Sequence, residues 1–218
     1  MPAPEDHARP SFATAQVQAG YVPGTRTATA VPPIHQSNAF EFASLAEARD
    51  LFALRRDGDI YSRAANPTVL VLEQRVTALE DGIAAAGVAS GQAAVAIALL
   101  ALAGRGGHIV AARQLYGGTI DLLGDTLVDW GIETTFVDQD DAAAWRRAAR
   151  PTTRAFFAET VANPIAQVLD VRAVADAAHE AGVPLVVDNT VATPYLQRPK
   201  EHGADIVVHS ATKFLGGH

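Results

Sequence analysis

No cysteine occurs among the 218 residues of this chain. That absence excludes disulfides, thiolate metal sites and a cysteine nucleophile, and it fits a cytoplasmic protein. Basic stripes are missing too: 24 acidic residues outnumber 17 lysines and arginines, and the net charge of -7 argues against nucleic acid as a partner. The seven histidines show no metal-ligand spacing, so we expect no metal.

Long apolar runs and nucleotide-binding motifs are also absent. The most apolar stretch, residues 93–103, is shorter than the ~20 residues that cross a bilayer, so we expect a buried helix there and no membrane partner. Residues 1–8 lack the basic-then-apolar pattern of a secretory leader. Neither Gly-x-Gly-x-x-Gly nor Gly-x-x-x-x-Gly-Lys-Ser/Thr occurs, so dinucleotide and nucleoside triphosphate binding lack their motifs.

The first sixty residues differ from the remainder. Residues 20–40 are rich in Gly, Pro and Thr without a period, which predicts an extended N-terminal arm. Ser44-Leu-Ala-Glu47 is a capping box that predicts a helix, and a second helix is expected from Asn66-Pro67 onward. We expect residues 1–60 to form an arm and helix that make oligomer contacts, and residues 61–218 to form the large, cofactor-binding domain.

From Gly87 onward, short apolar runs alternate with helix-period segments. The expected strands lie near residues 84–89, 108–112, 132–137, 154–158, 183–187 and 205–209. The expected helices lie near residues 91–103, 118–130, 140–149 and 171–181. Continuous apolar strands that alternate with helices predict an α/β fold with a mostly parallel sheet sandwiched by helices.

Two of the expected strands end in groups that suit one chemistry. Residues 205–209 lead into Ser210-Ala-Thr-Lys213, and residues 183–187 end in Asp188. The carboxyl ends of parallel strands share one edge of a sheet, where ligands bind. A lysine at the end of a buried strand loses its proton at small cost and condenses with a carbonyl. With an acid for the ring nitrogen, the pair predicts pyridoxal phosphate as the cofactor.

Each of these features also has an ordinary interpretation. A lysine after a strand is usually solvated, and an aspartate there is often a turn former or helix cap. The tetrad Ser210-Ala-Thr-Lys213 also matches the Ser-x-x-Lys nucleophile motif of serine acyl-transfer enzymes. The companion motifs of those enzymes, Ser-Asp-Asn and Lys-Thr-Gly, are absent.

Four further segments carry candidate ligand-binding groups. The Ser90-Gly-Gln turn offers close backbone approach and a helix start to a phosphate, or only an ordinary serine cap. Tyr116, on a glycine-flanked loop, could lie flat on a cofactor ring or pack on a helix. The Tyr61-Ser-Arg63 loop suits a phosphate, and Asn163 could donate to a phenolic oxygen or initiate a turn.

Together these segments resemble the transsulfuration, or Cys/Met-metabolism, family of pyridoxal-phosphate enzymes. The matching motifs occur in family order: Tyr61-Ser-Arg63, Asn66-Pro-Thr68, Ser90-Gly-Gln-Ala-Ala94, Leu115-Tyr-Gly-Gly-Thr119, Glu159-Thr-Val-Ala-Asn-Pro164, Val187-Asp-Asn-Thr190 and Ser210-Ala-Thr-Lys213. Within the family, residues 115–119, 188–195 and 203–209 are most similar to the O-acetylhomoserine sulfhydrylases. The resemblance implies the PLP-dependent transferase fold of type I.

The resemblance also implies a role for each matching residue. Lys213 bonds the cofactor covalently and then moves protons at the α and β carbons of the substrate, while Asp188 pairs with the pyridinium nitrogen. Tyr116 stacks on the ring and assists departure of the γ-substituent, and Asn163 touches the ring hydroxyl. The cofactor-binding set is completed by Tyr61 and Arg63 from a neighbouring subunit, and by Ser90, Gly91, Gln92, Thr190, Ser210 and Thr212.

The implied activity is γ-replacement on O-acetylhomoserine with sulfide or methanethiol, giving homocysteine or methionine, by a cytoplasmic homotetramer built as a dimer of dimers. Cystathionine γ-synthesis and methionine γ-elimination share these residues. Gly118 stands where methionine γ-lyases usually carry a cysteine, which favours replacement. Family members continue past residue 218 into a C-terminal domain with the arginine that binds the substrate carboxylate. We therefore expect a C-terminally truncated chain, and a non-catalytic fragment is the other alternative.

Overall fold

The computed structural model of the protein describes residues 10–23 and 29–216. Two compact units follow each other along the chain, Met1–Gly87 and Val88–His218. Contacts therefore group residues 61–87 with the N-terminal unit, whereas the sequence suggested a boundary at residue 60. The functional division into an arm and a cofactor-binding domain stays a prediction. The predictions for residues 1–8 and for residues 24–28 of the arm lie outside the described residues.

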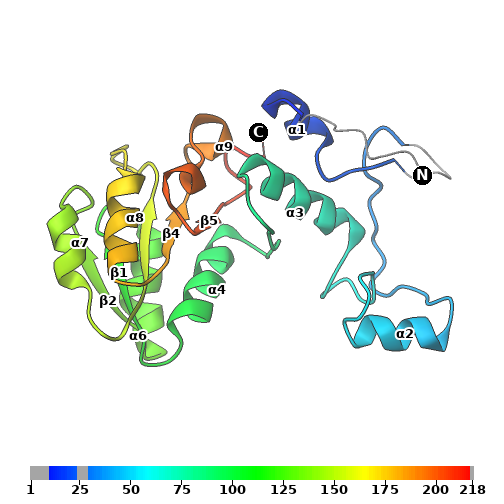
Figure 1. The fold of residues 1–218 in the computed structure, drawn as a ribbon, viewed down its shortest axis with the longest axis horizontal. Coiled ribbons are helices and arrows are strands. Elements are labelled where there is room, and N and C mark those ends of the chain that lie inside the picture. Colours follow the sequence, from blue (N-terminus) through cyan, green and yellow to red (C-terminus); the bar gives the residue numbers. More distant parts are fainter. Residues whose placement is uncertain (1–9, 24–28, 217–218) are drawn as a thin grey trace. The chain divides into compact units, whose positions relative to one another are not determined.

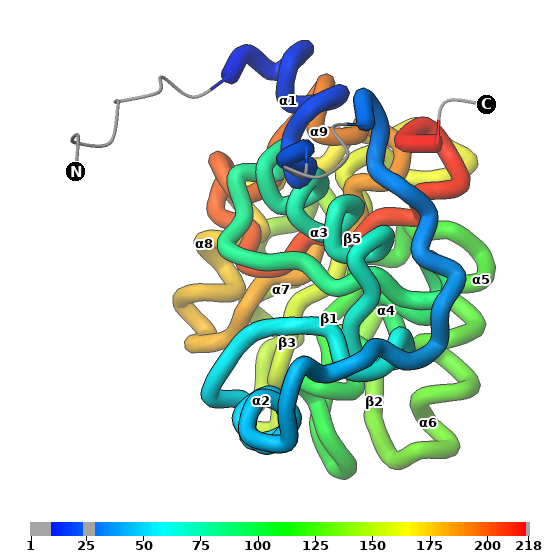
Figure 2. Tube along the Cα trace, turned by 90° about the vertical axis from the view of Figure 1, so that its right-hand side faces the viewer, coloured from blue at the N-terminus to red at the C-terminus, as the bar shows by residue number. Residues whose placement is uncertain are grey.

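A five-stranded parallel sheet forms the centre of the C-terminal unit (Figure 1). The strand order is β2-β1-β3-β4-β5, and Figure 2 shows β1 between β2 and β3. All four neighbouring pairs are parallel, which confirms the predicted sheet. The strands are β1 His108–Ala112, β2 Glu133–Val137, β3 Thr153–Glu159, β4 Leu185–Asp188 and β5 Ile206–Val208. Their carboxyl ends therefore lie along one edge.

Helices cover both faces of this sheet, as predicted. Helices α7 and α8 lie on one face and α4 and α6 on the other (Figure 1). The helical elements of this unit are α4 Gly91–Ala103, α5 Gly117–Asp121, the π-helical η1 Leu122–Thr126, α6 Leu127–Asp129, α7 Ala142–Ala148, α8 Val171–Glu180, α9 Thr193–Leu196 and the 3-10 helix η2 Pro199–His202. Because both faces are covered, every residue of β1 is buried, which accounts for the unbroken apolar run over residues 109–112.

The apolar stretch at residues 93–103 lies inside α4, as predicted. Val95, Leu99 and Ala103 recur at helical spacing and are buried in the core of the C-terminal unit. Over residues 10–23 and 29–216, no helix has both the length and the apolar character needed to cross a membrane.

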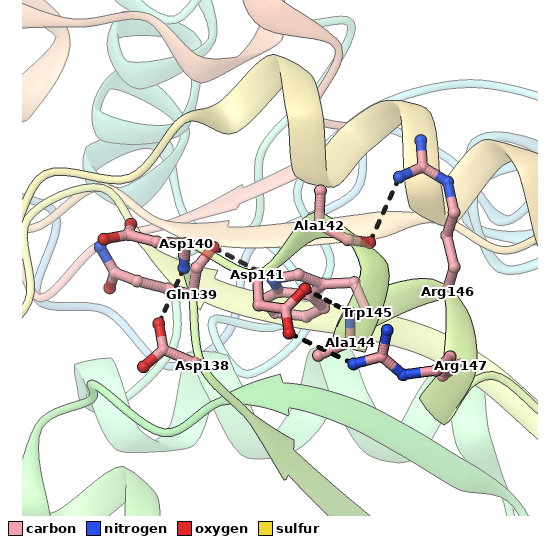
Figure 3. A network of polar contacts seen from close by, with 9 residues as sticks. All are labelled: Asp138, Gln139, Asp140, Asp141, Ala142, Ala144, Trp145, Arg146 and Arg147. Carbon is pink, nitrogen blue, oxygen red and sulfur yellow. Dashed lines mark hydrogen bonds and ion pairs between the residues drawn. The ribbon is translucent and has the colours of Figure 1, made fainter.

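The turn after β2 determines where α7 begins (Figure 3). Asp141 caps the helix, because its Oδ1 accepts a hydrogen bond from Ala144 N over 2.9 Å. The fully buried Trp145 donates from Nε1 to Gln139 O over 3.2 Å. Its ring stacks on Phe156 of β3, with 5.3 Å between the ring centroids. The cap and the tryptophan together fix α7 on the sheet.

Three helices occur among the described residues of the N-terminal unit: α1 Phe12–Gln18, α2 Leu45–Phe52 and α3 Pro67–Leu79. The two predicted helices and their caps are confirmed. Ser44 Oγ accepts from Glu47 N over 3.1 Å, and Asn66 Oδ1 accepts from Thr68 N over 2.9 Å. Helix α1 was not expected from the sequence. Residues 20–23 and 29–40 contain no helix, in agreement with an arm there.

The strand predicted at residues 84–89 is wrong. This segment is irregular and mostly exposed. Four alanines and a glycine make up most of it, and these residues are poor strand formers. Its backbone instead contacts a side chain of α3, because Gly87 N donates to Glu73 Oε1 over 2.7 Å. A Cβ at Gly87 would lie 2.9 Å from Val69 Cγ1, so the chain approaches the helix too closely for a larger residue.

Candidate active site

Two carboxylates end neighbouring strands at the same edge of the sheet. Glu159 is the last residue of β3, Asp188 is the last residue of β4, and the two are register partners. Burial raises the pKa of Asp188, although hydrogen bonds from Thr190 and the nearby His209 lower it in part. Burial also raises the pKa of Glu159, to about 7, and the charge of Asp188 adds to the increase. Both acids therefore ionise less readily than free side chains.

Thr190 connects the end of β4 to the turn that follows β5. Its main-chain nitrogen donates to Asp188 Oδ1 over 2.9 Å. Its hydroxyl oxygen accepts from Ser210 N over 2.8 Å, and Ser210 Oγ lies 3.1 Å from Thr212 Oγ1. Asp188, Thr190, Ser210 and Thr212, all predicted site residues, are thus joined by a continuous path of hydrogen bonds.

Lys213 lies in this same turn, where its main-chain nitrogen donates to Ser210 O over 3.1 Å. The turn comes after β5, an edge strand of the sheet whose residues Ile206 and Val207 are only half-buried. Lys213 itself is exposed. Val208, the last residue of β5, is buried, and Lys213 lies five residues beyond it. The role of Lys213 stays a prediction.

The Ser90-Gly91-Gln92 turn meets the Ser210 turn at close range. A Cβ at position 91 would lie 2.6 Å from Ser210 Cβ and 2.9 Å from Ser210 Cα. Only glycine allows this approach. Ser90 Oγ accepts from Ala93 N over 3.1 Å and caps α4. The first turn of a 13-residue helix, with its positive dipole end, therefore begins beside Ser210.

The side chain of Gln92 is hydrogen-bonded to the segment that follows Tyr116. Its side-chain Nε2 donates to the buried Thr119 Oγ1 over 3.1 Å. Tyr116 immediately precedes α5, and half of its side chain is exposed. The edge of its ring lies above Gly118, where a Cβ would come within 2.8 Å of Tyr116 Cε1. The aromatic group is therefore available to a ligand at this edge of the sheet.

Glu159 holds the loops of two predicted site residues. Its Oε1 accepts from Tyr116 N over 2.7 Å, and its Oε2 accepts from Asn163 N over 3.2 Å. The prediction of site residues missed Glu159, although this residue is the first of the matching motif Glu159-Thr-Val-Ala-Asn-Pro164. A signal was present: residues 155–158 form an apolar run that ends in an acid, the same pattern that singled out Asp188.

Tyr61 and Arg63 belong to the N-terminal unit. The Arg63 guanidinium carbon lies 5.3 Å from the centroid of the Tyr61 ring, a cation–π contact, and both side chains are exposed. The buried Asn66 fixes their loop, since its Nδ2 donates to Ser62 Oγ over 2.8 Å and to His35 O over 3.1 Å. The remaining predicted residues all lie in the C-terminal unit.

A family model described as Cys/Met metabolism PLP-dependent enzyme matches residues 13–218. The chain belongs to this family. The predicted family and its cofactor, pyridoxal phosphate, are thereby confirmed. Over residues 10–23 and 29–216, no group of three His, Asp or Glu side chains is arranged to hold a metal ion.

Relatives with known names point to one branch of the family. The chain is 50% identical over 208 residues to an O-acetyl-L-homoserine sulfhydrylase of Corynebacterium glutamicum, covering 95% of this chain and 48% of that protein. It is 49% identical over 205 residues to the O-acetyl-L-homoserine sulfhydrylase of Leptospira meyeri, covering 94% of this chain and 46% of the relative. The chain thus spans about half the length of the curated relatives it matches.

A solved structure agrees with the fold. The chain superposes with a TM-score of 0.92 and 36% identity on a putative O-acetylhomoserine (thiol)-lyase from Campylobacter jejuni, covering 95% of this chain and 51% of that one. The crystal structure of that protein contains N'-pyridoxyl-lysine-5'-monophosphate. The predicted fold, a pyridoxal-phosphate-dependent α/β domain with a parallel sheet, is confirmed.

Proposed function

We propose that the protein carrying this chain binds pyridoxal phosphate at the carboxyl ends of β3, β4 and β5 and catalyses γ-replacement on O-acetylhomoserine. Sulfide or methanethiol would be the second substrate, and homocysteine or methionine the product. The observation that carries the proposal is the hydrogen-bonded path from Asp188 through Thr190 to Ser210, which brings an acid, hydroxyl groups and the turn of Lys213 to one place.

The groups around Ser210 fit a phosphate. A glycine at position 91 leaves the space that a Cβ would fill, and the start of α4 offers main-chain N–H groups and a positive dipole end. The hydroxyls of Ser210 and Thr212 add two donors. Because the side-chain amide of Gln92 is bonded to Thr119, Gln92 would contribute its main-chain N–H group.

The groups beside Asp188 fit a ring with a cationic nitrogen. Burial raises the pKa of Asp188, so a positive partner would stabilise its ionised form. Tyr116 would cover one face of the ring and assist departure of the γ-substituent, and Asn163 would donate to the ring hydroxyl. Pyridoxal phosphate, when bound, supplies an electron sink for negative charge that develops on the substrate.

Lys213 would hold the cofactor covalently and then carry protons between the α and β carbons of the substrate. Tyr61 and Arg63 would complete the phosphate site from a neighbouring subunit, where the flat guanidinium suits phosphate oxygens. A cytoplasmic dimer of dimers is part of this proposal, and light scattering on the purified protein tests the assembly.

Cystathionine γ-synthase and methionine γ-lyase activities use the same residues and are the alternatives. Gly118 favours replacement, because the Tyr116 ring occupies the space that a larger side chain at position 118 would need. A fragment without catalytic activity is the other alternative. Assays with O-acetylhomoserine and O-succinylhomoserine, each against sulfide, methanethiol and cysteine, separate these activities.

Cofactor attachment provides a direct test, because Lys200 and Lys213 are the chain's two lysines. Added pyridoxal phosphate should produce a visible absorbance band, and borohydride reduction followed by peptide mass spectrometry should locate the cofactor on Lys213. Lys213→Ala should abolish the band, while the control Lys200→Ala should keep it. A colourless wild-type protein, or a label found on Lys200, would overturn the proposal.

A further inference from the structure

The carboxylate of Glu159 is enclosed and fully engaged. Its side chain is 5% exposed. One oxygen accepts from the main chain of Tyr116 over 2.7 Å and the other accepts from the main chain of Asn163 over 3.2 Å. Since both donors are N–H groups, the ionised form of the carboxylate is the one that satisfies both bonds at once.

These two bonds join loops that are distant in sequence. Tyr116 lies 43 residues before Glu159, and Asn163 lies four residues after it. No side chain caps the helix that begins after Tyr116. Glu159 therefore places a negative charge at the start of α5. The same carboxylate binds the main chain of the loop after β3. The strand register puts this carboxylate beside Asp188.

We propose that Glu159 is a positioning residue, whose ionised carboxylate clamps the Tyr116 loop to the Asn163 loop and so sets the aromatic ring and the amide relative to Asp188. The enclosed side chain does not reach a ligand, and it acts through the two main chains that it holds. The proposal deepens the proposed function in one respect, since it assumes that Tyr116 and Asn163 meet the cofactor ring.

Protonation of Glu159 would open the clamp, because a neutral carboxyl group turns its own O–H toward one of the two N–H donors. Burial raises the pKa of Glu159 to about 7, which places this change near neutrality. The groups that face Glu159 are the two amides and the carboxylate of Asp188, whose charge acts in the same direction as burial. The clamp should therefore tighten as the pH rises through 7.

Nuclear magnetic resonance on the protein without added cofactor tests the clamp itself. The amide protons of Tyr116 and Asn163 should shift with pH in wild type, with a common midpoint near 7. Glu159→Gln should abolish the titration and speed hydrogen exchange at both amides by roughly tenfold or more, since a bond to a charged group is lost. The control Glu180→Gln removes an exposed carboxylate paired with Arg146 and should change neither amide.

A second measurement tests the consequence for the ligand. With pyridoxal phosphate as the probe, Glu159→Gln should raise the Kd read from the absorbance band by about tenfold, and Glu180→Gln should leave it unchanged. Wild-type exchange rates at Tyr116 and Asn163 in Glu159→Gln would overturn the clamp. A wild-type protein that binds no pyridoxal phosphate would overturn the proposed function instead, and the exchange data would still decide the role of Glu159.

Discussion

Glu159 and Asp188 are side-by-side partners, each the last residue of its strand. Burial raises the pKa of both side chains, and the charge of Asp188 raises the pKa of Glu159 further. A cationic partner would stabilise the ionised forms of two adjacent acids whose pKa values are raised. The two acids at the carboxyl edge of the sheet therefore favour binding of a positively charged group. Their raised pKa values should also make the stability of the fold depend on pH.

The free energy of unfolding should fall as the pH rises from about 4.5 to about 7. Glu159 has a pKa of about 7 when folded against 4.5 for the free side chain, so in this interval the folded state binds a proton that the unfolded chain has lost. Such a group stabilises the fold at low pH, and its contribution is lost as the pH passes the folded pKa. The shift corresponds to roughly 3 kcal/mol at most.

Urea unfolding of wild type and Glu159→Gln, at pH values below 5 and above 7, measures this contribution. The variant should lose most of the slope between the two conditions. Asp188 contributes a slope of the same sign in both proteins. Because the charges of Asp188 and Glu159 are coupled, the difference between the proteins measures Glu159 together with this coupling. Equal slopes in the two proteins would contradict the raised pKa.

Gly91→Ala should destabilise the fold. The new Cβ would lie 2.6 Å from Ser210 Cβ and 2.9 Å from its Cα, so the main chain must shift, at a cost of about 1–3 kcal/mol. Because the same shift would enlarge the gap between α4 and the Ser210 turn, we also expect weaker binding of pyridoxal phosphate. Equilibrium unfolding and the absorbance band measure the two effects.

Gly124→Ala is the matched control. Its nearest neighbour, Phe136 Cε2, lies 4.0 Å from the new Cβ, and alanine is the better helix former by about 1 kcal/mol. This variant should be as stable as wild type or slightly more stable. Equal loss of stability in both variants would mean that helical glycines are needed generally, and that contact with Ser210 is not the cause.

Much of the fold could be predicted because its signals are local. A helix start is stabilised by a hydrogen bond between a side chain and a main-chain amide two or three residues later. Asn66 and Ser90 make such bonds, so they predicted the starts of α3 and α4 correctly. The inner strands each contain an unbroken apolar run because both faces of the sheet are covered. The run at residues 84–89 was misjudged, since apolarity alone does not supply strand propensity or a partner.

The parts of the site that the sequence did not reveal depend on contacts between distant segments. Glu159 matters because Tyr116, 43 residues away, turns its amide toward it. The turn that carries Lys213 lies beside Thr190 because β5 pairs with β4, which is a property of strand order. The Gly91 approach to Ser210 likewise joins residues more than a hundred positions apart, and no pattern within either segment encodes it.

Asp141→Ala should lower the free energy of unfolding by about 1 kcal/mol. The change removes the cap on α7, a bond of 2.9 Å to Ala144 N, and the start of that helix holds the buried Trp145 against the sheet (Figure 3). Arg147→Ala is the comparison, because it removes only the exposed ion pair of 3.2 Å with Asp141. Its cost should stay below about 0.5 kcal/mol. A larger loss in Arg147→Ala would assign the stabilisation to the ion pair.

Gly118→Ala should alter turnover while leaving the fold intact. The added methyl group would come within 2.8 Å of Tyr116 Cε1, but this ring is half exposed and can rotate away. The unfolding midpoint should therefore stay near that of wild type. Because Tyr116 would no longer lie where it assists the leaving group, γ-replacement should slow by roughly tenfold or more, as expected for a displaced general acid.

Tyr116→Phe, which keeps the ring and lacks the hydroxyl, should slow the reaction without displacing the ring. If Gly118→Ala reacts at the wild-type rate while Tyr116→Phe does not, the position of the ring is not set by Gly118.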